Sequence, residues 1–255
     1  MIPKNIYYVW VGGKDKPEIF HKCYNSWKQH LPSYNIVEIN ESNFDLQYHL
    51  ANNKFFRACY NRKMWAFVSD YMRVIYLYDN GGIYLDTDME IVQDFSKLIN
   101  NDTEFFAGFE DDYLINGAIL GASKGSPILK SIIEFYNEGI WYSPYFSIPS
   151  IITHILNNDL PINRKLKDSY FDKNVKIYPQ HYFYPYHYTQ EFSKRCITKD
   201  TYGIHWWSHS WNKIDDYIFL RTKHMSGYRK KVISFLIRKK QTFNKMKTIS
   251  KLNKD

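Results

Sequence analysis

The chain has 255 residues, a formal net charge of +8, and hydrophobic and charged fractions of 44% and 24%. These fractions are close to globular averages, which argues against a disordered or fibrous protein, and the length fits one domain. No apolar run approaches the roughly 20 residues of a membrane-spanning helix. No secretory leader precedes the first strand signal, and the three cysteines form no CxxC pair, so we expect free thiols in a reducing cytosol.

The positive charge is concentrated at the C-terminus. Residues 228–255 contain ten lysines and arginines and one acid, whereas residues 1–227 contain 24 basic and 25 acidic residues. Apolar residues recur in this tail at steps of three, four or seven: Val232, Phe235, Leu236, Phe243, Met246, Ile249 and Leu252. The pattern predicts a basic amphipathic helix that binds an anionic membrane surface. A solvated extension is the main alternative, and nucleic acid is not the expected partner.

The first ninety residues alternate strand and helix signals. We expect strands at Ile6–Val11, Tyr34–Ile39 and Ile83–Asp86, and helices at Glu18–His30 and Met64–Tyr78. Later strand signals lie at Phe105–Phe109, Ile115–Leu120, Val175–Tyr178 and Tyr202–Trp206, and later helix signals at Pro127–Asn137 and Pro149–Leu156. The alternation predicts an α/β fold in residues 1–227, with a mostly parallel central sheet flanked by helices, followed by the tail as a separate extension.

Two carboxylates follow the third strand. If Asp86 and Asp88 continue it, both side chains face the same space and Thr87 points away. Open α/β sheets bind ligands at the carboxyl ends of their strands, and a divalent cation is the natural partner of two converging carboxylates. An isolated DxD is more often a solvated turn, so the preceding residues 81–85, GGIYL, give this one its weight.

The preceding helix carries an acidic and a basic residue on one face. Asp70 and Arg73 are three positions apart, and Ser69 precedes them. A surface salt bridge is one interpretation. The apolar residues around them favour a partly buried pair instead.

Three segments together resemble a known family: residues 3–13 (PKNIYYVWVGG), residues 69–73 (SDYMR) and residues 81–88 (GGIYLDTD). They are similar to the sugar-binding DXD-containing glycosyltransferases of glycosyltransferase family 32. That group includes bacterial capsular and surface-polysaccharide transferases and the yeast initiating α-1,6-mannosyltransferase, and more distantly resembles the glucosylating clostridial toxins. The resemblance implies a GT-A fold, a divalent metal (manganese favoured, magnesium possible) and a retaining reaction from a sugar nucleotide, with UDP favoured.

The resemblance also assigns residues to the donor site. It implies that Asp88 binds the metal directly and that Asp86 contacts ribose and metal, while Asp70 and Arg73 hold the donor sugar and diphosphate. Together with Asp86 and Asp88, these two form the expected catalytic set. The other residues it assigns to the donor are Val9, Trp10 (stacked on the base), Ser69, Tyr84, Asn116, Ser210 and Trp211.

The segment 205–211, HWWSHSW, is similar to the C-terminal site segment of these enzymes. By that similarity His205 is the third metal ligand, with His209 in reserve. The alternative is an aromatic strand with core or surface histidines.

Two features of this chain leave the acceptor side open. Ser147-Ile148-Pro149 stands where relatives often have Thr-Gly-Pro, and no carboxylate is clearly placed as a nucleophile. We interpret residues 110–112 (Glu-Asp-Asp) as a solvated acidic turn and favour a front-face displacement. The aromatic residues within 136–145 and 178–188 fit a carbohydrate acceptor, although core packing explains at least half of them.

These observations favour a metal-dependent retaining hexosyltransferase that acts on a glycan or lipid-linked oligosaccharide in bacterial surface-polysaccharide (capsule) synthesis. We expect it in the cytoplasm, peripheral at the inner face of the cell membrane. The alternatives are a toxin-like effector that glycosylates a protein, a DxD-metal phosphoesterase and a basic binding module.

Overall fold

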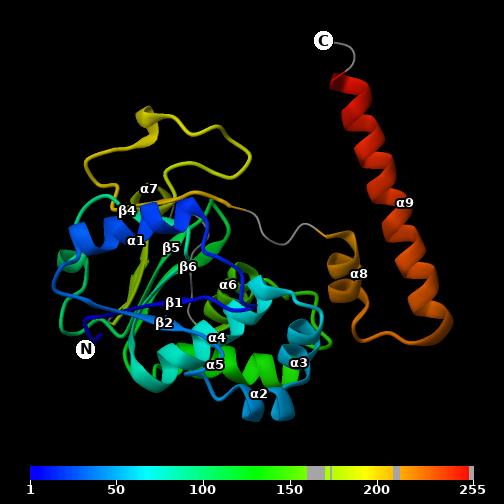
Figure 1. The fold of residues 1–255 in the computed structure, drawn as a ribbon, viewed down its shortest axis with the longest axis horizontal. Coiled ribbons are helices and arrows are strands. Elements are labelled where there is room, and N and C mark those ends of the chain that lie inside the picture. Colours follow the sequence, from blue (N-terminus) through cyan, green and yellow to red (C-terminus); the bar gives the residue numbers. More distant parts are fainter. Residues whose placement is uncertain (160–169, 173, 209–212, 253–255) are drawn as a thin grey trace.

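A seven-stranded sheet forms the centre of the computed structural model, which describes residues 1–159, 170–172, 174–208 and 213–252 (Figure 1). The strands are β1 (Asn5–Val9), β2 (Asn35–Ile39), β3 (Gly82–Leu85), β4 (Met89–Ile91), β5 (Phe105–Phe109), β6 (Ile115–Ala122), β7 (Tyr170–Asp172), β8 (Val175–Tyr178) and β9 (Gly203–His205). The large sheet has the order β2-β1-β3-β6-β5-β8-β7, and β4 and β9 form a separate antiparallel pair. Only β6 and β7 run against the other strands of the large sheet, which confirms the mostly parallel α/β architecture.

Helices cover both faces of the sheet (Figure 1). They are α1 (Glu18–His30), α2 (Leu46–Asn52), α3 (Lys54–Asn61), α4 (Trp65–Asn80), α5 (Pro127–Glu134), α6 (Ile148–Asp159), α7 (Gln180–Phe183), α8 (Ile214–Thr222) and α9 (Gly227–Leu252). Alternation along β1 sends Tyr7 and Val9 to the core under α4 and α5, and Ile6 and Tyr8 to the core under α1. The chain between α4 and β3 turns sharply at two glycines with positive φ, Gly81 and Gly82.

Several predicted boundaries need correction; the first strand, for example, ends at Val9 and not at Val11. The third strand ends at Leu85, so Asp86 is not part of it. The helix expected over Pro127–Asn137 is α-helical only to Glu134 and continues as a single π-helical turn over Phe135–Gly139, and the last strand is shorter than Tyr202–Trp206. The three cysteines are free thiols, with Cys23 and Cys59 buried.

The two C-terminal helices differ in how they pack on the α/β domain. Phe219 and Leu220 of α8 are buried in the same core as α4 and α5, so α8 is part of that domain. Helix α9 begins at Gly227, contacts α8 and extends away from the sheet (Figure 1). An ion pair between Arg238 and Asp215 joins the two helices. No helix in the described part of the chain combines the length and apolarity needed to cross a bilayer.

Candidate active site

A turn after β3 carries the two aspartates. The Asp86 N–H donates to the Ala118 carbonyl at 2.8 Å, which binds Asp86 to β6. The Met89 N–H donates to the Asp86 carbonyl at 2.9 Å and closes the turn. The two carboxylates therefore converge through a turn, and strand alternation is the wrong explanation for their common direction. The two carboxylates still face the same space, as expected, because ligand atoms of Asp86, Asp88 and His205 all lie within 4.8 Å of one another.

His205 reaches this site from the far end of the chain. Antiparallel pairing of β4 with β9 puts Met89 opposite His205, and the Trp206 N–H donates to the Asp88 carbonyl at 3.0 Å. His205 Nε2 lies 3.1 Å from Asp88 Oδ1 and 4.0 Å from Asp86 Oδ2. The backbone N–H of Ser208 donates to Asp88 Oδ2 at 2.7 Å.

The electrostatics of the three side chains favour a cation between them. Burial alone raises the pKa of Asp88, but His205 and the Ser208 amide outweigh burial and hold that pKa well below its usual range. Burial lowers the pKa of His205, yet the facing carboxylates raise it overall. Among the described residues nothing pairs with the buried His205 Nδ1. Two carboxylates and an imidazole form an oxygen and nitrogen ligand set that fits a divalent ion such as Mn²⁺.

A buried arginine links helix α4 to the aspartate turn. Arg73 Nη2 lies 2.8 Å from Asp70 Oδ1 and 3.0 Å from Asp86 Oδ1, and Nη1 donates to the Gly117 carbonyl at 2.8 Å. The guanidinium also lies 4.2 Å from the centre of the Tyr84 ring. Both members of the predicted pair are buried, so the surface salt bridge is excluded. Burial raises the pKa of Asp70 to about 6, against the lowering effect of Arg73 and with the help of Asp86.

Hydroxyl groups complete this network. Ser69 Oγ and the Tyr84 hydroxyl lie 3.0 Å apart, and the Tyr84 hydroxyl donates to Asp86 Oδ1 at 2.9 Å. Asp86 thus receives both Arg73 and Tyr84 on one oxygen. Four predicted donor-site residues from α4 and β3 therefore form one connected group around the aspartate turn.

The β5–β6 hairpin contains a buried carboxylate. Glu110 is only 6% exposed, and Asn116 Nδ2 donates to its Oε2 at 2.8 Å. Burial raises the pKa of Glu110. The interpretation of residues 110–112 as a solvated turn is wrong for Glu110, although Asp111 does cap the turn by accepting the N–H groups of Tyr113 and Leu114.

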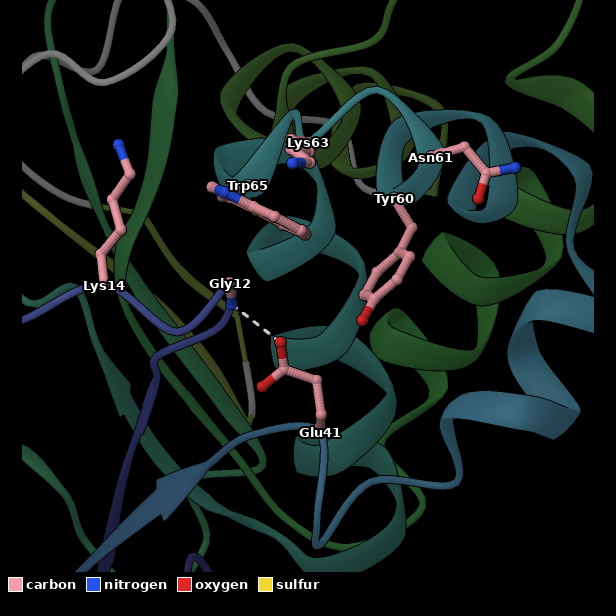
Figure 2. Close-up of a pocket in the computed structure, with 7 residues that line it drawn as sticks. All are labelled: Gly12, Lys14, Glu41, Tyr60, Asn61, Lys63 and Trp65. Carbon is pink, nitrogen blue, oxygen red and sulfur yellow. Dashed lines mark hydrogen bonds between the residues drawn. The ribbon is translucent and has the colours of Figure 1, made fainter.

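A pocket of about 450 Å³ opens beside the carboxyl ends of β1 and β2 (Figure 2). It is lined by Gly12, Lys14, Glu41, Tyr60, Asn61, Lys63 and Trp65. Its volume is in the range of small-molecule sites. Figure 2 shows the Trp65 ring above Gly12, whose N–H donates to Glu41 Oε1 at 2.8 Å.

Two other predicted donor-site residues, Val9 at the end of β1 and Trp10 just after it, do not line this pocket. Val9 is buried in the core, so only its backbone could reach a ligand. Trp10 packs toward α1, with its ring centre 6.1 Å from that of Phe20 and its Nε1 donating to the Lys14 carbonyl. His209, Ser210 and Trp211 lie outside the described residues.

The sequence patterns missed several residues near the site. Trp207 adopts a left-handed backbone, with φ of 53°, and its ring centre lies 4.2 Å from that of His205. His187 lies near Glu110, and Glu41 and Trp65 line the pocket. Trp207 lies within the predicted site segment 205–211 but had no role assigned to it, and no spacing motif singles out the other three, because each comes from a different loop or helix.

Parts of this chain are similar in sequence to known proteins. Residues 17–105, which include Asp70, Arg73, Asp86 and Asp88, match the model of the glycosyltransferase sugar-binding region containing DXD motif. The lactosylceramide 4-alpha-galactosyltransferases of Rattus norvegicus and Homo sapiens are 27% and 26% identical over 154 and 155 residues, which is 55% of this chain. The match spans only 40% and 41% of those proteins.

A solved structure supports the same fold. The PaToxG glycosyltransferase superposes with a TM-score of 0.51 at 19% identity, over 63% of this chain and 70% of that one. At this identity the likeness is one of architecture. The sequence match, for its part, shows that residues 17–105 are similar to the glycosyltransferase sugar-binding region containing the DXD motif.

Proposed function

We propose that the protein is a metal-dependent glycosyltransferase that moves a hexose from a nucleotide sugar to an acceptor hydroxyl. One observation carries the proposal: the carboxylates of Asp86 and Asp88 converge with His205, while Arg73 binds Asp86 Oδ1 and leaves Oδ2 near His205. A cation at the carboxylates together with the Arg73 guanidinium suits a diphosphate leaving group.

The pocket and the aspartate turn are related by helix α4. Trp65, Ser69 and Arg73 follow one another at four-residue steps, so they share one face of the helix. At 1.5 Å per residue, that face runs about 12 Å from the pocket to the aspartate turn. We propose that the pocket takes the nucleoside and that the diphosphate lies toward Asp86 and Asp88. Trp10 and Trp65 are the two candidates for stacking on the base, and UDP is the favoured carrier, as the family resemblance implies.

The proposed metal site consists of Asp86, Asp88 and His205, and Mn²⁺ is favoured over Mg²⁺. A bound divalent ion would neutralise the diphosphate as it departs. Arg73 would hold a phosphate oxygen, and Asp70 would accept hydrogen bonds from donor-sugar hydroxyls. Ser69, Tyr84 and Asn116 would orient these groups. His209, Ser210 and Trp211 keep their proposed donor-side roles.

We propose a front-face displacement with retention. The bond between the sugar C1 and the leaving phosphate oxygen breaks, and a bond from C1 to the acceptor oxygen forms on the same face. The acceptor proton passes to the leaving phosphate. Mass spectrometry after incubation with donor should find no glycosylated carboxylate; a sugar on Glu110 would establish a covalent route instead.

The C-terminal residues 228–255 would act as a membrane-binding extension. Tyr228, Phe235 and Leu236 of α9 are 81%, 64% and 52% exposed. Exposed basic residues surround them: Arg229, Lys231, Arg238, Lys239 and Lys240. Exposed apolar groups among lysines and arginines fit an anionic lipid surface. A lipid-linked glycan at the inner face of a bacterial membrane, as in capsule synthesis, is therefore the proposed acceptor, and a toxin-like action on a protein is the alternative.

Thermal-shift measurements test the donor. UDP-glucose, UDP-galactose, UDP-N-acetylhexosamines and GDP-mannose should be compared with and without Mn²⁺, and at least one should stabilise the protein only when the ion is present. Donor turnover should fall at least about 100-fold in Asp88→Ala. The control Asp79→Ala changes an exposed carboxylate at the far end of α4 and should behave as wild type. Equal turnover in Asp88→Ala and wild type would overturn the metal assignment, whereas phosphate release from simple phosphoesters would favour a phosphoesterase.

A further inference from the structure

A second cluster of side chains lies beside the metal-binding group, on the side away from the nucleoside pocket. Glu110 is its buried carboxylate. One oxygen accepts from Asn116, while the other, Oε1, lies 3.8 Å from His187 Nε2, too far for a hydrogen bond. A buried carboxylate oxygen is strongly stabilised by a hydrogen-bond donor, so the gap between Glu110 and His187 favours a ligand hydroxyl.

The imidazole in this cluster is held in place. His187 Nδ1 lies 2.8 Å from Thr189 Oγ1, which directs Nε2 toward Glu110. The side chain of His187 is 22% exposed, so the pair is accessible from solvent on the His187 side. The carboxylate and the imidazole can therefore contact the same hydroxyl-bearing ligand.

Aromatic rings form a wall next to the pair. The Tyr188 ring centre lies 4.0 Å from that of His187 and 5.7 Å from that of Trp207, and Tyr188 is 50% exposed. Trp207 is fixed by its left-handed backbone and by an Nε1 hydrogen bond to the Tyr186 carbonyl at 3.1 Å. A bulky residue keeps this conformation only where its surroundings hold it, and such strain is concentrated at functional sites.

The sheet order gives the cluster its position relative to the donor. Along the sheet order β1-β3-β6-β5, the pocket follows β1, Asp86 follows β3, Asn116 is the second residue of β6 and Glu110 follows β5. Neighbouring strands are about 4.8 Å apart, so two strand spacings put Glu110 about 10 Å beyond Asp86. A donor that extends from the pocket to Asp86 leaves this region for the second substrate.

We infer that Glu110, His187, Tyr188 and Trp207 form the acceptor subsite and that it takes a pyranose ring. A sugar offers what the cluster lacks, because its C–H face packs on aromatic rings while its hydroxyls donate to a carboxylate and accept from an imidazole. This inference rests on the proposed function only in requiring an acceptor at all.

Binding of sugars without donor tests the subsite directly. Methyl glucopyranosides, galactopyranosides and mannopyranosides of both anomeric forms should be screened by saturation-transfer NMR. At least one should bind the wild type, and Tyr188→Ala and Glu110→Ala should each weaken it about tenfold. Tyr188→Phe keeps the ring and should retain binding. Tyr48→Ala removes an exposed tyrosine on α2 and serves as the matched control.

Turnover distinguishes this subsite from the donor site. With the best hexoside as acceptor, its KM should rise about tenfold in Tyr188→Ala while the donor KM stays within about twofold. Wild-type binding that is unaffected by Tyr188→Ala and Glu110→Ala would overturn the inference. So would transfer to a protein by an enzyme that binds no hexoside. Failure of every nucleotide sugar in the thermal-shift test would overturn the proposed function and leave the NMR result standing.

Discussion

Asp88 and His205 stand 117 positions apart in the chain, and His205 Nε2 lies 3.1 Å from Asp88 Oδ1. The register of β4 and β9 creates this contact. In the absence of a cation the imidazole keeps its proton more readily, because the carboxylates raise its pKa against the effect of burial. Metal binding therefore competes with this proton.

Manganese binding should release a proton. The protonated imidazole has no lone pair for the metal, so Mn²⁺ affinity should rise with pH and level off above the raised pKa of His205. Calorimetry in buffers of different ionisation enthalpy measures the proton release. His205→Gln should abolish the release and weaken binding, and an affinity that does not vary with pH in the wild type would contradict this prediction.

Arg73→Lys should inactivate the protein. Arg73 contacts Asp70, Asp86 and the Gly117 carbonyl at once, and a lysine cannot reproduce that fork. Donor turnover should fall about 10- to 100-fold, and the loss of buried partners should lower stability by about 1–3 kcal/mol. Turnover assays and denaturant unfolding measure both effects. The exposed Arg57→Lys is the control, and a lysine variant with normal turnover would remove Arg73 from the proposed catalytic set.

Protonation of Asp70 should make donor turnover fall at acidic pH, which gives the pH–activity profile an acid limb. Burial raises the pKa of Asp70 to about 6, so it loses its charge below that pH, and donor turnover should decline there. Residual activity of Asp70→Asn should lack this limb. A limb that persists unchanged in Asp70→Asn would belong to another group.

The raised pKa of Asp70 should also make the stability of the folded protein depend on pH. The folded-state pKa of Asp70 is above the ordinary value of 3.8, so between about pH 4 and 6 the folded protein binds more protons than the unfolded chain. Its contribution to the free energy of unfolding therefore improves as pH falls through this window. Relative to Asp70→Asn, the wild type should gain stability when urea unfolding is compared at pH 7 and at about pH 4.5.

Gly12→Ala should impair nucleotide binding more than Gly13→Ala. Both glycines have positive φ, so both substitutions add backbone strain of about 1 kcal/mol. A Cβ on Gly12 would lie 2.5 Å from Trp65 Cε2, whereas a Cβ on Gly13 meets nothing within 4 Å. Calorimetric UDP affinity should fall about tenfold more in the first variant. Equal affinities in the two variants would argue that the nucleoside binds elsewhere.

Replacing two exposed residues of α9 should release the protein from membranes. The double variant Phe235→Ser, Leu236→Ser removes apolar side chains that are 64% and 52% exposed, so the fold should be unaffected. In a sedimentation assay, phosphatidylcholine vesicles that contain phosphatidylglycerol should bind the wild type. The affinity of the variant for the same vesicles should be at least about tenfold lower. Vesicles of phosphatidylcholine alone are the control. Equal wild-type binding to both vesicle types would exclude an electrostatic attachment.

The fold was largely predictable because local periodicity and turn residues define its elements. Helix α1 has the expected bounds Glu18–His30, since its apolar residues recur at helical spacing before Pro32. The alternation of strands and helices was enough to indicate a mostly parallel sheet. The end of β3 was less predictable, because a strand and a tight turn both accept the sequence LDTD.

By itself, the sequence determined the local elements, the family resemblance and the concentration of charge in residues 228–255. Those properties depend on neighbours in the chain. Only the tertiary structure decided that Glu110 is buried, that Trp207 has a left-handed backbone, and that Asp88 meets His205. Each of these depends on strand register and on loops that meet at one edge of the sheet, and such long-range contacts have no signature in the spacing of residues.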